Sequence, residues 1–326
     1  MTELLVLSGS DVRELLSYAE CATVMRSALA ELARGEIEQP LRSVVRPSGA
    51  AGFQVLMPSY ASSAGYGLKA LCITPGNPSR GLDAHQGGVM LFAADTGEPV
   101  ALVNASALTE IRTATVSAVA TGLLARPDAS LAAIIGTGVQ GVAHARALAA
   151  TRALSGIRMY GRSDSRTAAV AAGLADELGL PVTAAASAAE AVRGARIVVT
   201  ATTSRDPVIA WEWLAPGAHV NAVGACVPSD REIDTATMAA AALFADSRES
   251  LENEAGDYLL AVKDGAEIGP VRATLGELLA GTGQGRRDEQ EITVFESLGL
   301  AAEDLMAASF VYRKAAGLGV GTAANF

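Results

Sequence analysis

The sequence predicts an α/β fold in two domains, one a doubly wound parallel sheet and the other an α+β domain with a mostly antiparallel sheet. Three observations predict it. Residues 131–150 read as a buried apolar strand, a tight glycine turn and an alanine-rich helix. Beyond Pro127, the candidate domain boundary, strand-length and helix-length segments alternate, which is typical of a parallel sheet. Residues 40–103 instead hold only strand-length runs separated by glycine, proline and asparagine.

The N-terminal part is expected to begin with a short strand over residues 3–7 and a first helix opened by Ser10. A second, amphipathic helix follows over residues 17–35 and ends at Gly35. Residues 95–98 have the composition of a hairpin turn. The expected strands of this part cover residues 41–46, 52–57, 66–73, 86–92 and 99–103.

A long helix is expected over residues 107–125, and a last helix over 301–316 carries apolar residues suited to packing back on the first domain. We therefore assign residues 1–115 with 301–326 to one discontinuous domain and residues 116–300 to the other. The chain of 326 residues is long enough for both. The expected parallel strands cover residues 131–135, 157–161, 196–200, 219–223, 243–246 and 292–295, with helices at 164–178, 187–194 and 247–262.

The glycine turn after residue 135 predicts a Rossmann-type dinucleotide site. Gly136 allows the sharp turn, Gly138 allows the backbone to approach a pyrophosphate, and Gly141 allows the helix to close on the strand. The phosphates then lie at the positive end of the helix, against the backbone of Thr137, Val139 and Gln140. The alternative is an ordinary strand–helix turn. The strand before the motif and the helix after it favour dinucleotide binding.

Composition excludes several classes of function. With 25 basic and 35 acidic residues the formal net charge is −10, which argues against binding to nucleic acid or to an anionic membrane. The N-terminus lacks the features of a signal peptide, and no apolar run is long enough to span a membrane. The three cysteines are isolated, and the three histidines lack acidic neighbours, so we expect neither disulfides nor a metal site. A cytoplasmic location is the expectation.

Residues at the end of the second parallel strand bear on cofactor choice. An enzyme that prefers NAD usually carries an acid there to hold the ribose hydroxyls. This chain has Arg162, Ser163 and Arg166, which suit a 2′-phosphate, so NADP(H) is favoured and NAD(H) remains possible. The alternative is that Ser163 caps the next helix, Asp164 complements its dipole and the arginines are solvated.

Three cations in the first domain predict a site for a carboxylate. Strand alternation places Lys69 on an apolar face, where it must reach a partner or lose its charge. Arg42 lies in an otherwise apolar strand, and Arg112 interrupts a helix of small residues. Guanidinium groups hold carboxylates in a bidentate fork, so converging cations favour a substrate that carries a carboxylate. A lysine whose ammonium reaches solvent from an edge strand is the alternative.

These features occur together with motifs by which the chain resembles the ornithine cyclodeaminase/μ-crystallin family over nearly its whole length. It is more similar to the μ-crystallin-like ketimine reductases than to the cyclodeaminases. The motifs that carry the resemblance are residues 39–45, 55–60, the strand with Lys69, 85–86, 111–114, 136–141, 217–225, 231–234 and 293–299.

The resemblance implies roles for particular residues. Arg42, Lys69 and Arg112 would bind the carboxylate of the substrate and carry the chemistry. The first domain would bind the substrate and would form a homodimer through its sheet. The residues implied to approach the cofactor are Thr113, Ala201, Thr202, Val223, Ser297 and Leu298.

Two departures from the cyclodeaminase pattern narrow the expected activity. Val55 stands where cyclodeaminases carry a glutamate, and Cys226 stands where they carry an aspartate that handles the substrate amine. Both acids of the cyclisation are therefore missing. Asp230 from the next loop is a possible replacement, although an acid at a helix start is the simpler interpretation, and His85 is either a residue of the cleft or a structural histidine.

The expected activity is NAD(P)H-dependent reduction of an α-imino acid, linear or cyclic, to an L-amino acid, or the reverse dehydrogenation. Deamination of the ornithine cyclodeaminase or alanine dehydrogenase type is one alternative. A non-catalytic, NADPH-dependent ligand-binding protein like μ-crystallin is the other. Turnover with any imine separates the catalytic from the non-catalytic class.

Overall fold

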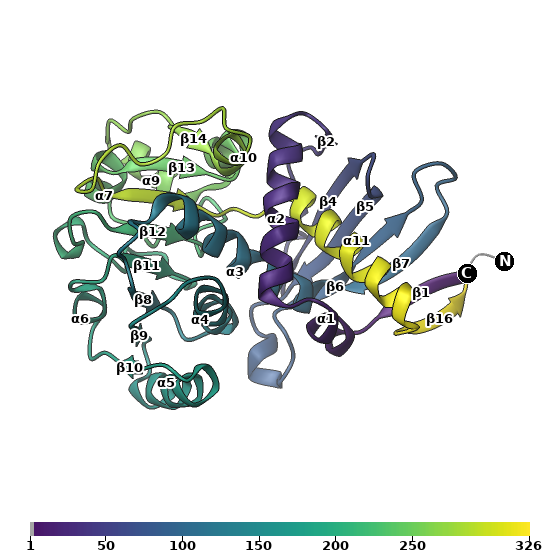
Figure 1. Ribbon diagram of the computed structural model, residues 1–326, viewed down its shortest axis with the longest axis horizontal. Coiled ribbons are helices and arrows are strands. Elements are labelled where there is room, and N and C mark those ends of the chain that lie inside the picture. The colour runs from purple at the N-terminus through teal and green to yellow at the C-terminus, as the bar shows by residue number, and fades with distance from the viewer. Residues whose placement is uncertain (1–2) are drawn as a thin grey trace. The chain divides into compact units, whose positions relative to one another are not determined.

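The computed structural model describes residues 3–326 and confirms the predicted α/β fold with its two sheets (Figure 1). The chain divides into two compact units. Unit 1 comprises the residues up to Arg112 together with Leu300–Phe326, and unit 2 comprises Thr113–Gly299. The division falls inside helix α3 (Ala105–Leu124). In the described part of the chain, no helix combines the length and the apolar character that crossing a membrane requires.

Unit 1 is built on an eight-stranded sheet of order β16-β1-β7-β6-β5-β4-β2, with β3 paired to β4. Its pairs are antiparallel except for β1 with β7, so the sheet is mostly antiparallel as predicted. The strands are β1 (Glu3–Leu7), β2 (Ile37–Glu38), β3 (Ser43–Val45), β4 (Phe53–Ala61), β5 (Gly65–Ile73), β6 (His85–Phe92), β7 (Pro99–Asn104) and β16 (Thr322–Asn325).

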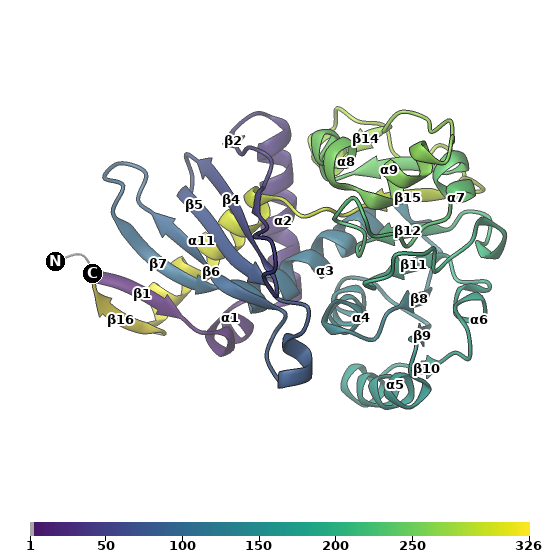
Figure 2. The ribbon, with the colours of Figure 1, turned by 180° about the vertical axis from the view of Figure 1, so that it is seen from behind.

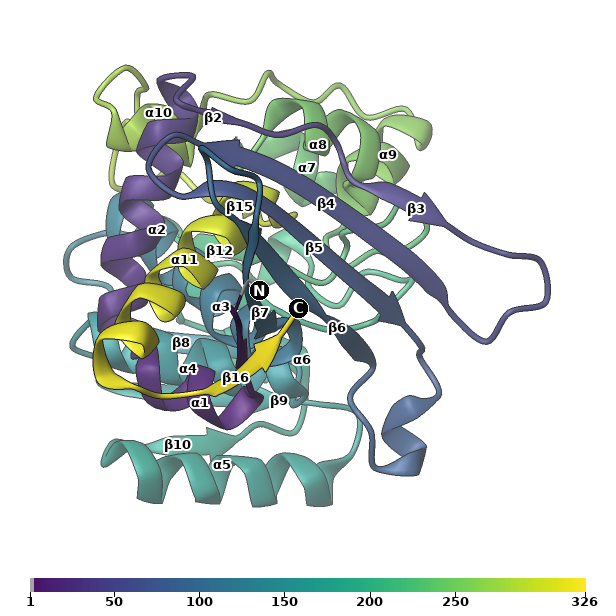
Figure 3. The same ribbon diagram turned by 90° about the vertical axis from the view of Figure 1, so that its right-hand side faces the viewer.

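Helix α11 (Ala301–Leu318) packs against β4, β5 and β6 and alongside α2 (Tyr18–Ala33), as Figure 3 shows. The last helix therefore returns to the first domain, as its apolar residues predicted. The first helix, α1 (Gly9–Leu15), begins at Ser8 and not at Ser10. Ser8 accepts from the backbone N–H of Asp11, whose carboxylate accepts from that of Ser8, a reciprocal cap that Ser10 cannot form. A short 3₁₀ turn spans Asn77–Arg80.

Unit 2 is built on an eight-stranded sheet of order β10-β9-β8-β11-β12-β15-β13-β14, and every pair is parallel. Strand order reverses between β8 and β11, the position at which doubly wound sheets bind ligands at their carboxyl ends. The strands are β8 (Leu131–Ile135), β9 (Gly156–Tyr160), β10 (Val182–Ala184), β11 (Ile197–Thr200), β12 (His219–Ala222), β13 (Ala242–Ala245), β14 (Ala273–Thr274) and β15 (Thr293–Glu296).

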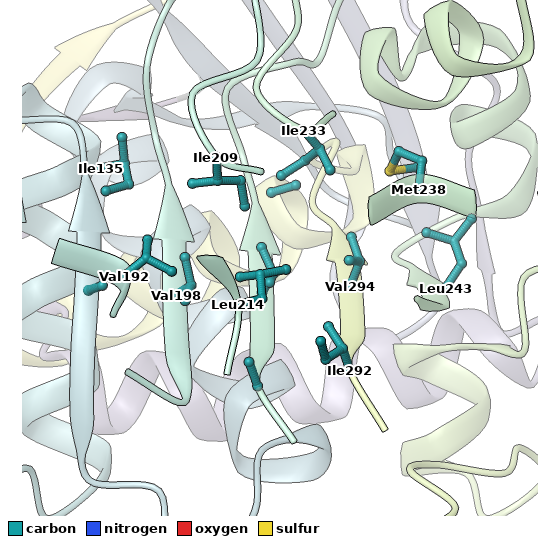
Figure 4. Close-up of a cluster of buried hydrophobic side chains, with 14 of the residues drawn as sticks. Ile135, Val192, Val198, Ile209, Leu214, Ile233, Met238, Leu243, Ile292 and Val294 are labelled. Carbon is teal, nitrogen blue, oxygen red and sulfur yellow. The ribbon is translucent and has the colours of Figure 1, made fainter. Parts of the chain in front are cut away.

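Helices cover both faces of this sheet, with α3 and α4 on one face and α6 and α7 on the other (Figure 2). Ile135, Val198 and Val294 point from the strands into the α6 and α7 side, where Met238 and Leu243 join them (Figure 4). Each such side chain contributes about 1.5–3 kcal/mol by leaving water. The helices of this unit are α4 (Val139–Thr151), α5 (Asp164–Leu178), α6 (Ala188–Val192), α7 (Thr235–Ala240), α8 (Arg248–Glu254), α9 (Gly256–Lys263) and α10 (Leu275–Leu279), with a 3₁₀ turn at Trp211–Trp213.

The single helix expected over residues 247–262 is interrupted, because α8 ends before Ala255 and α9 begins at Gly256. The break coincides with close contacts to the loop that contains Asp230. Any side chain at Gly256 would collide with the carbonyl oxygen of Asp230, and Asp257 is committed to other backbone groups. A continuous helical pattern in the sequence does not reveal these contacts from a distant loop.

Candidate active site

Lys69 is the most constrained cation of unit 1. It lies on β5 between Met57 of β4 and Val89 of β6, and only 3% of its side chain is exposed. Its ammonium donates to both carboxylate oxygens of Asp304, each at 3.0 Å. The lysine therefore reaches a buried partner and does not extend to solvent.

Arg112, on α3, converges on the same acid. Its Nε donates to Asp304 Oδ1 at 3.0 Å, and its Nη1 donates to Glu303 Oε2 at 2.6 Å. Both acids lie in the first turn of α11, where the helix dipole favours negative charge. The structure thus brings Lys69 and Arg112 together through a pair of buried carboxylates. No role was predicted for these acids, although two adjacent acids at the start of a largely apolar helix are visible in the sequence.

Arg42 lies just before β3, and so outside the strand in which it was expected. The strand is shorter than the apolar pattern suggested, and Arg42 is half-buried. Its positive charge, like that of Arg112, lowers the pKa of Lys69. Arg42 therefore lies within electrostatic reach of the buried ion cluster. The nearby Arg46 follows β3, and its guanidinium lies 3.9 Å from the centre of the Phe53 ring.

Burial lowers the pKa of Lys69 to about 8, with Asp304 opposing this shift and Arg112 adding to it. A lysine with such a pKa exchanges its proton near neutrality. His85, the first residue of β6, is affected by the same charges, because desolvation, followed by the positive charges of Lys69 and Arg112, lowers its pKa. The imidazole of His85 thus belongs to the surroundings of the cation cluster.

The glycine turn of unit 2 has the form that a dinucleotide requires. Gly136 has a φ of +127°, and a side chain there would collide with the carbonyl of Ala201. A side chain at Gly141 would collide with the carbonyl of Gly136. A Cβ at Gly138, the N-cap of α4, would meet only open space, and Val139 beside it is 62% exposed. Two glycines are therefore needed for packing, and the third leaves room for a phosphate at a helix N-terminus.

The residues proposed to bind a 2′-phosphate differ in their contacts. Ser163 caps α5 and accepts from the backbone N–H of Arg166, so the structural alternative for this serine is realised. Arg166 also donates to the carbonyl of Thr137 in the glycine turn, at 3.2 Å. The exposed Arg162 makes no hydrogen bond or ion pair with any residue from 3 to 326. Both guanidinium groups are exposed, and that of Arg162 has no bond to give up before it binds a ligand.

The remaining residues expected near a cofactor follow three neighbouring strands. Ala201 and Thr202 come after β11, Val223 comes after β12, and Ser297 and Leu298 come after β15. Because these strands are adjacent and parallel, the three loops emerge at the same edge of the sheet. Thr113, the remaining member of the set, is buried in α3.

Two buried acids, Glu232 and Asp246, bind the backbone of these loops. Neither acid was predicted to have this role. Glu232 accepts from the backbone N–H groups of Thr202 and Gly224, each at 2.6 Å. Asp246 accepts from those of Leu298 and Gly299, each at 2.7 Å. Charged residues in loops are usually exposed, so no local pattern marks these acids as buried.

The two residues that depart from the cyclodeaminase pattern are Val55 and Cys226. Val55 is buried on β4 in an apolar cluster with Met57, Leu71 and Ala301. Cys226 is half-buried.

Asp230 does not start a helix, contrary to the simpler interpretation given above. Asp230 lies in a turn, where its backbone N–H donates to the carbonyl of Val227. The Nε of Arg205 lies 3.9 Å from its carboxylate. The residue that caps α7 is Asp234, which accepts from the backbone N–H of Thr237. A turn of several residues thus separates Asp230 from the helix that it was expected to begin.

Known proteins of similar sequence are enzymes that act on imino acids or ketimines. The chain is 36% identical to Delta(1)-pyrroline-2-carboxylate reductase of Bacillus cereus over 99% of its length and 100% of that protein. It is 35% identical to the ketimine reductase mu-crystallin of Mus musculus, covering 94% of this chain and 96% of the relative.

Two solved structures have the same fold. The structure of Thermococcus litoralis Delta(1)-pyrroline-2-carboxylate reductase in complex with NADH and L-proline matches with a TM-score of 0.94, at 35% identity over 98% of this chain and 99% of that one. An archaeal alanine dehydrogenase dimer with bound NAD matches with a TM-score of 0.94, at 30% identity over the whole of both chains. Residues 2–318 match the ornithine cyclodeaminase/mu-crystallin family, and the chain therefore belongs to that family.

Proposed function

We propose that this protein is a nicotinamide-dependent oxidoreductase that reduces the C=N bond of an α-imino acid, linear or cyclic, to give an L-amino acid, or catalyses the reverse dehydrogenation. The observation that carries the proposal is the buried Lys69 with a pKa near 8, paired with Asp304 beside Arg112. Relatives that act as Delta(1)-pyrroline-2-carboxylate reductase and ketimine reductase support the reaction class.

The cations of the cluster suit a substrate that carries a carboxylate. Lys69 and Arg112 converge on Asp304, and Arg42 lies within electrostatic reach of Lys69. Converging cations favour binding of an anionic group. Guanidinium also offers parallel N–H donors to both oxygens of a carboxylate, and this orients the substrate as well as binding it.

Reduction of an imine needs a hydride at carbon and a proton at nitrogen. A reduced nicotinamide supplies the hydride when it is bound. Lys69 donates the proton, because its lowered pKa allows the ammonium to release it near neutral pH. Asp304 holds the ammonium in place before transfer, through the two bonds at 3.0 Å. The protonated imine accepts hydride better than the neutral one, so the proton and the hydride steps support each other.

We assign the dinucleotide to the glycine turn, with the pyrophosphate against the backbone of residues 136–141. NADP(H) is favoured over NAD(H), because the exposed guanidinium of Arg162 is available to a 2′-phosphate. The solved relatives contain NADH or NAD, so NAD(H) remains the alternative.

We also propose a homodimer formed through the sheet of unit 1. The archaeal alanine dehydrogenase of the same fold is a dimer. On β5, Tyr66 is exposed on the face opposite Lys69, and its ring lies 4.6 Å from that of Tyr60 on β4. An aromatic pair with one exposed ring on a sheet face suits contact with a second copy. Small-angle scattering that finds only monomers would exclude this assembly.

The test of the activity is a substrate screen with the purified protein. Cyclic imino acids such as Delta(1)-pyrroline-2-carboxylate, and 2-oxo acids mixed with ammonia or methylamine, are incubated with NADPH or NADH while oxidation of the nicotinamide is followed. We expect turnover with at least one imine and an L-configured product by chiral chromatography. Tight NADPH binding without turnover of any imine would favour the non-catalytic ligand-binding alternative.

A further inference from the structure

Glu232 of unit 2 differs from the other buried acids in how it uses its carboxylate. Asp257 uses one oxygen, Oδ1, for the backbone N–H groups of Glu232 and Ile233, at 2.7 and 2.8 Å. Asp246 likewise uses one oxygen for two consecutive N–H groups. Glu232 uses Oε1 for Thr202 and Oε2 for Gly224, so its two oxygens hold two different loops.

The two loops occupy equivalent places in the sheet. Strands β11 and β12 are parallel neighbours, with Thr200 opposite Ala222. Thr202 and Gly224 each follow two residues later, so the carboxylate bridges the first turns beyond the two strands. The approach is close, because a Cβ at Gly224 would lie 2.6 Å from the carboxylate carbon of Glu232. The bridge fixes the separation of the loops at the point where they leave the sheet.

One of these loops touches the glycine turn. A side chain at Gly136 would collide with the carbonyl of Ala201, the residue before Thr202. The backbone that Glu232 holds is therefore the surface on which the sharp turn at Gly136 rests. A shift of this loop would move the turn and, with it, the N-terminus of α4, where we place the pyrophosphate.

The energetics favour a positioning role. Glu232 has no solvent-exposed surface, and desolvation raises its pKa, with the bonds from Thr202 and Gly224 opposing this rise. Hydrogen bonds to a charged group do little more than offset the cost of burying a carboxylate. Stability alone therefore explains this acid poorly, whereas fixed geometry between two loops explains it well.

We infer that Glu232 is a positioning residue for the dinucleotide, which it serves by bridging the loops after β11 and β12. This inference rests on the proposed nicotinamide-dependent function. Glu232 itself does not contact the cofactor. It acts through the backbone of Thr202, Ala201 and Gly136.

A pair of isosteric variants tests the inference. In Glu232→Gln the amide keeps one acceptor oxygen but turns N–H donors toward the second loop, so one of the two loops is released. In Asp257→Asn the amide oxygen replaces Oδ1 and keeps both of its bonds. Each variant replaces a buried carboxylate of unit 2 with a neutral amide. Only Glu232 needs both of its oxygens as acceptors, so only its replacement should lose a loop contact. The dissociation constants of NADH and NADPH are measured by fluorescence titration, with stability followed separately by thermal unfolding.

We expect Glu232→Gln to weaken binding of the preferred nucleotide by about tenfold or more, which corresponds to about 1.4 kcal/mol. Asp257→Asn should bind within about twofold of wild type. At saturating cofactor, the KM for the imine should be similar in wild type and Glu232→Gln, because the substrate cations lie in unit 1. A loss of thermal stability without a change in nucleotide affinity is the signature of a merely structural acid.

Equal affinities in wild type and Glu232→Gln, or an equal loss in both variants, would overturn the inference while leaving the proposed function in place. A wild-type protein that binds neither nucleotide would instead remove the proposed function and this inference with it. If Glu232→Gln does not fold, amide hydrogen exchange in the wild-type protein tests the bridge instead. The amides of Thr202 and Gly224 should then be protected without nucleotide and slower still with it, and rapid exchange at either one contradicts the bridge.

Discussion

Lys69 Nζ lies 3.0 Å from each carboxylate oxygen of Asp304, so the ammonium is held symmetrically by one buried acid. Arg112 shares that acid through its Nε, also at 3.0 Å. Asp304 thus separates two cations that would otherwise repel each other in a site of low polarity. Its negative charge also opposes the fall in the pKa of Lys69 that burial causes, and the resulting value is about 8.

Asp304→Asn should therefore lower the pKa of Lys69 further. The isosteric amide removes the charge that favours the ammonium, and loss of an opposite charge at this distance is worth about one pKa unit or more. The alkaline limb of the kcat/KM profile for imine reduction should move to lower pH by about that amount. Glu303→Gln is the matched control, because Glu303 bonds to Arg112 and not to Lys69. The control should raise KM and leave the alkaline limb where it is in wild type.

Arg162→Ala should discriminate between the two nicotinamide cofactors. Loss of a charge-assisted contact to the 2′-phosphate should raise the dissociation constant of NADPH by about tenfold or more, and that of NADH by less than about twofold. Arg34→Ala serves as a control, since Arg34 is an exposed arginine of unit 1 paired with Glu36. Equal losses for both cofactors in Arg162→Ala would show that Arg162 does not contact the phosphate.

L-Ornithine should not be converted to proline at a useful rate. Cyclodeamination needs acids to handle the amine, and the side chains at the two expected positions are the buried Val55 and the half-buried Cys226. Isotopically labelled ornithine incubated with NAD should release no ammonia, under conditions in which an imine substrate is reduced. Formation of labelled proline with catalytic NAD would show that another acid, such as Asp230, supplies the missing group.

Glu296 should make the stability of the protein fall as the pH rises above about 4.5. Only 1% of the residue is exposed, and burial, followed by the charges of Asp257, Glu232 and Asp246, raises its pKa well above 4.5. A carboxyl whose pKa is raised in the folded state contributes stability that is full below its unfolded pKa and is lost as the pH rises through its folded pKa.

Glu296→Gln does not titrate, so its free energy of unfolding relative to wild type should increase above about pH 4.5. The expected slope is up to about 1.4 kcal/mol per pH unit. Urea unfolding at several pH values between about 5 and 8 measures this slope. The exposed Glu36, whose pKa Arg34 lowers, provides a control in which Glu36→Gln should gain nothing with rising pH. A flat difference for Glu296→Gln would show that the acid is ionised in the folded protein.

Local patterns predicted much of the fold and the cofactor turn. The strand, glycine turn and helix from residue 131 onward are specified by neighbours in sequence, and strand alternation placed Lys69 on the buried face of β5. Asp304 escaped prediction because it lies 235 residues away in sequence, and only the docking of α11 brings it to Lys69. The pairing of β16 with β1 joins the two ends of the chain and is non-local in the same way.

The buried acids of unit 2 were missed for a different physical reason. Glu232, Asp246 and Asp257 occur in segments whose polarity resembles that of surface loops, and each accepts from backbone N–H groups of loops that are distant in sequence. Propensity and periodicity describe side chains and carry no information about such converging amides. The break between α8 and α9 has the same origin, since it follows from the contacts of Gly256 and Asp257.

The central claim is that Lys69 donates a proton to the imine nitrogen and does more than bind the carboxylate. The two roles respond differently to Lys69→Arg, which preserves the positive charge but holds its proton throughout this pH range. If Lys69 only binds, the arginine variant keeps much of the turnover and mainly raises KM. Lys69→Met removes both roles and provides the reference for complete loss.

The decisive measurement is single-turnover imine reduction by wild type, Lys69→Arg and Lys69→Met at saturating nicotinamide cofactor, with cofactor binding checked in each. We predict that both variants lose about a hundredfold or more in the rate of reduction, the scale of a removed general acid, while they still bind the cofactor. Near-wild-type turnover in Lys69→Met, with the cofactor bound, would contradict the account and leave Arg42 and Arg112 as the groups that act on the substrate.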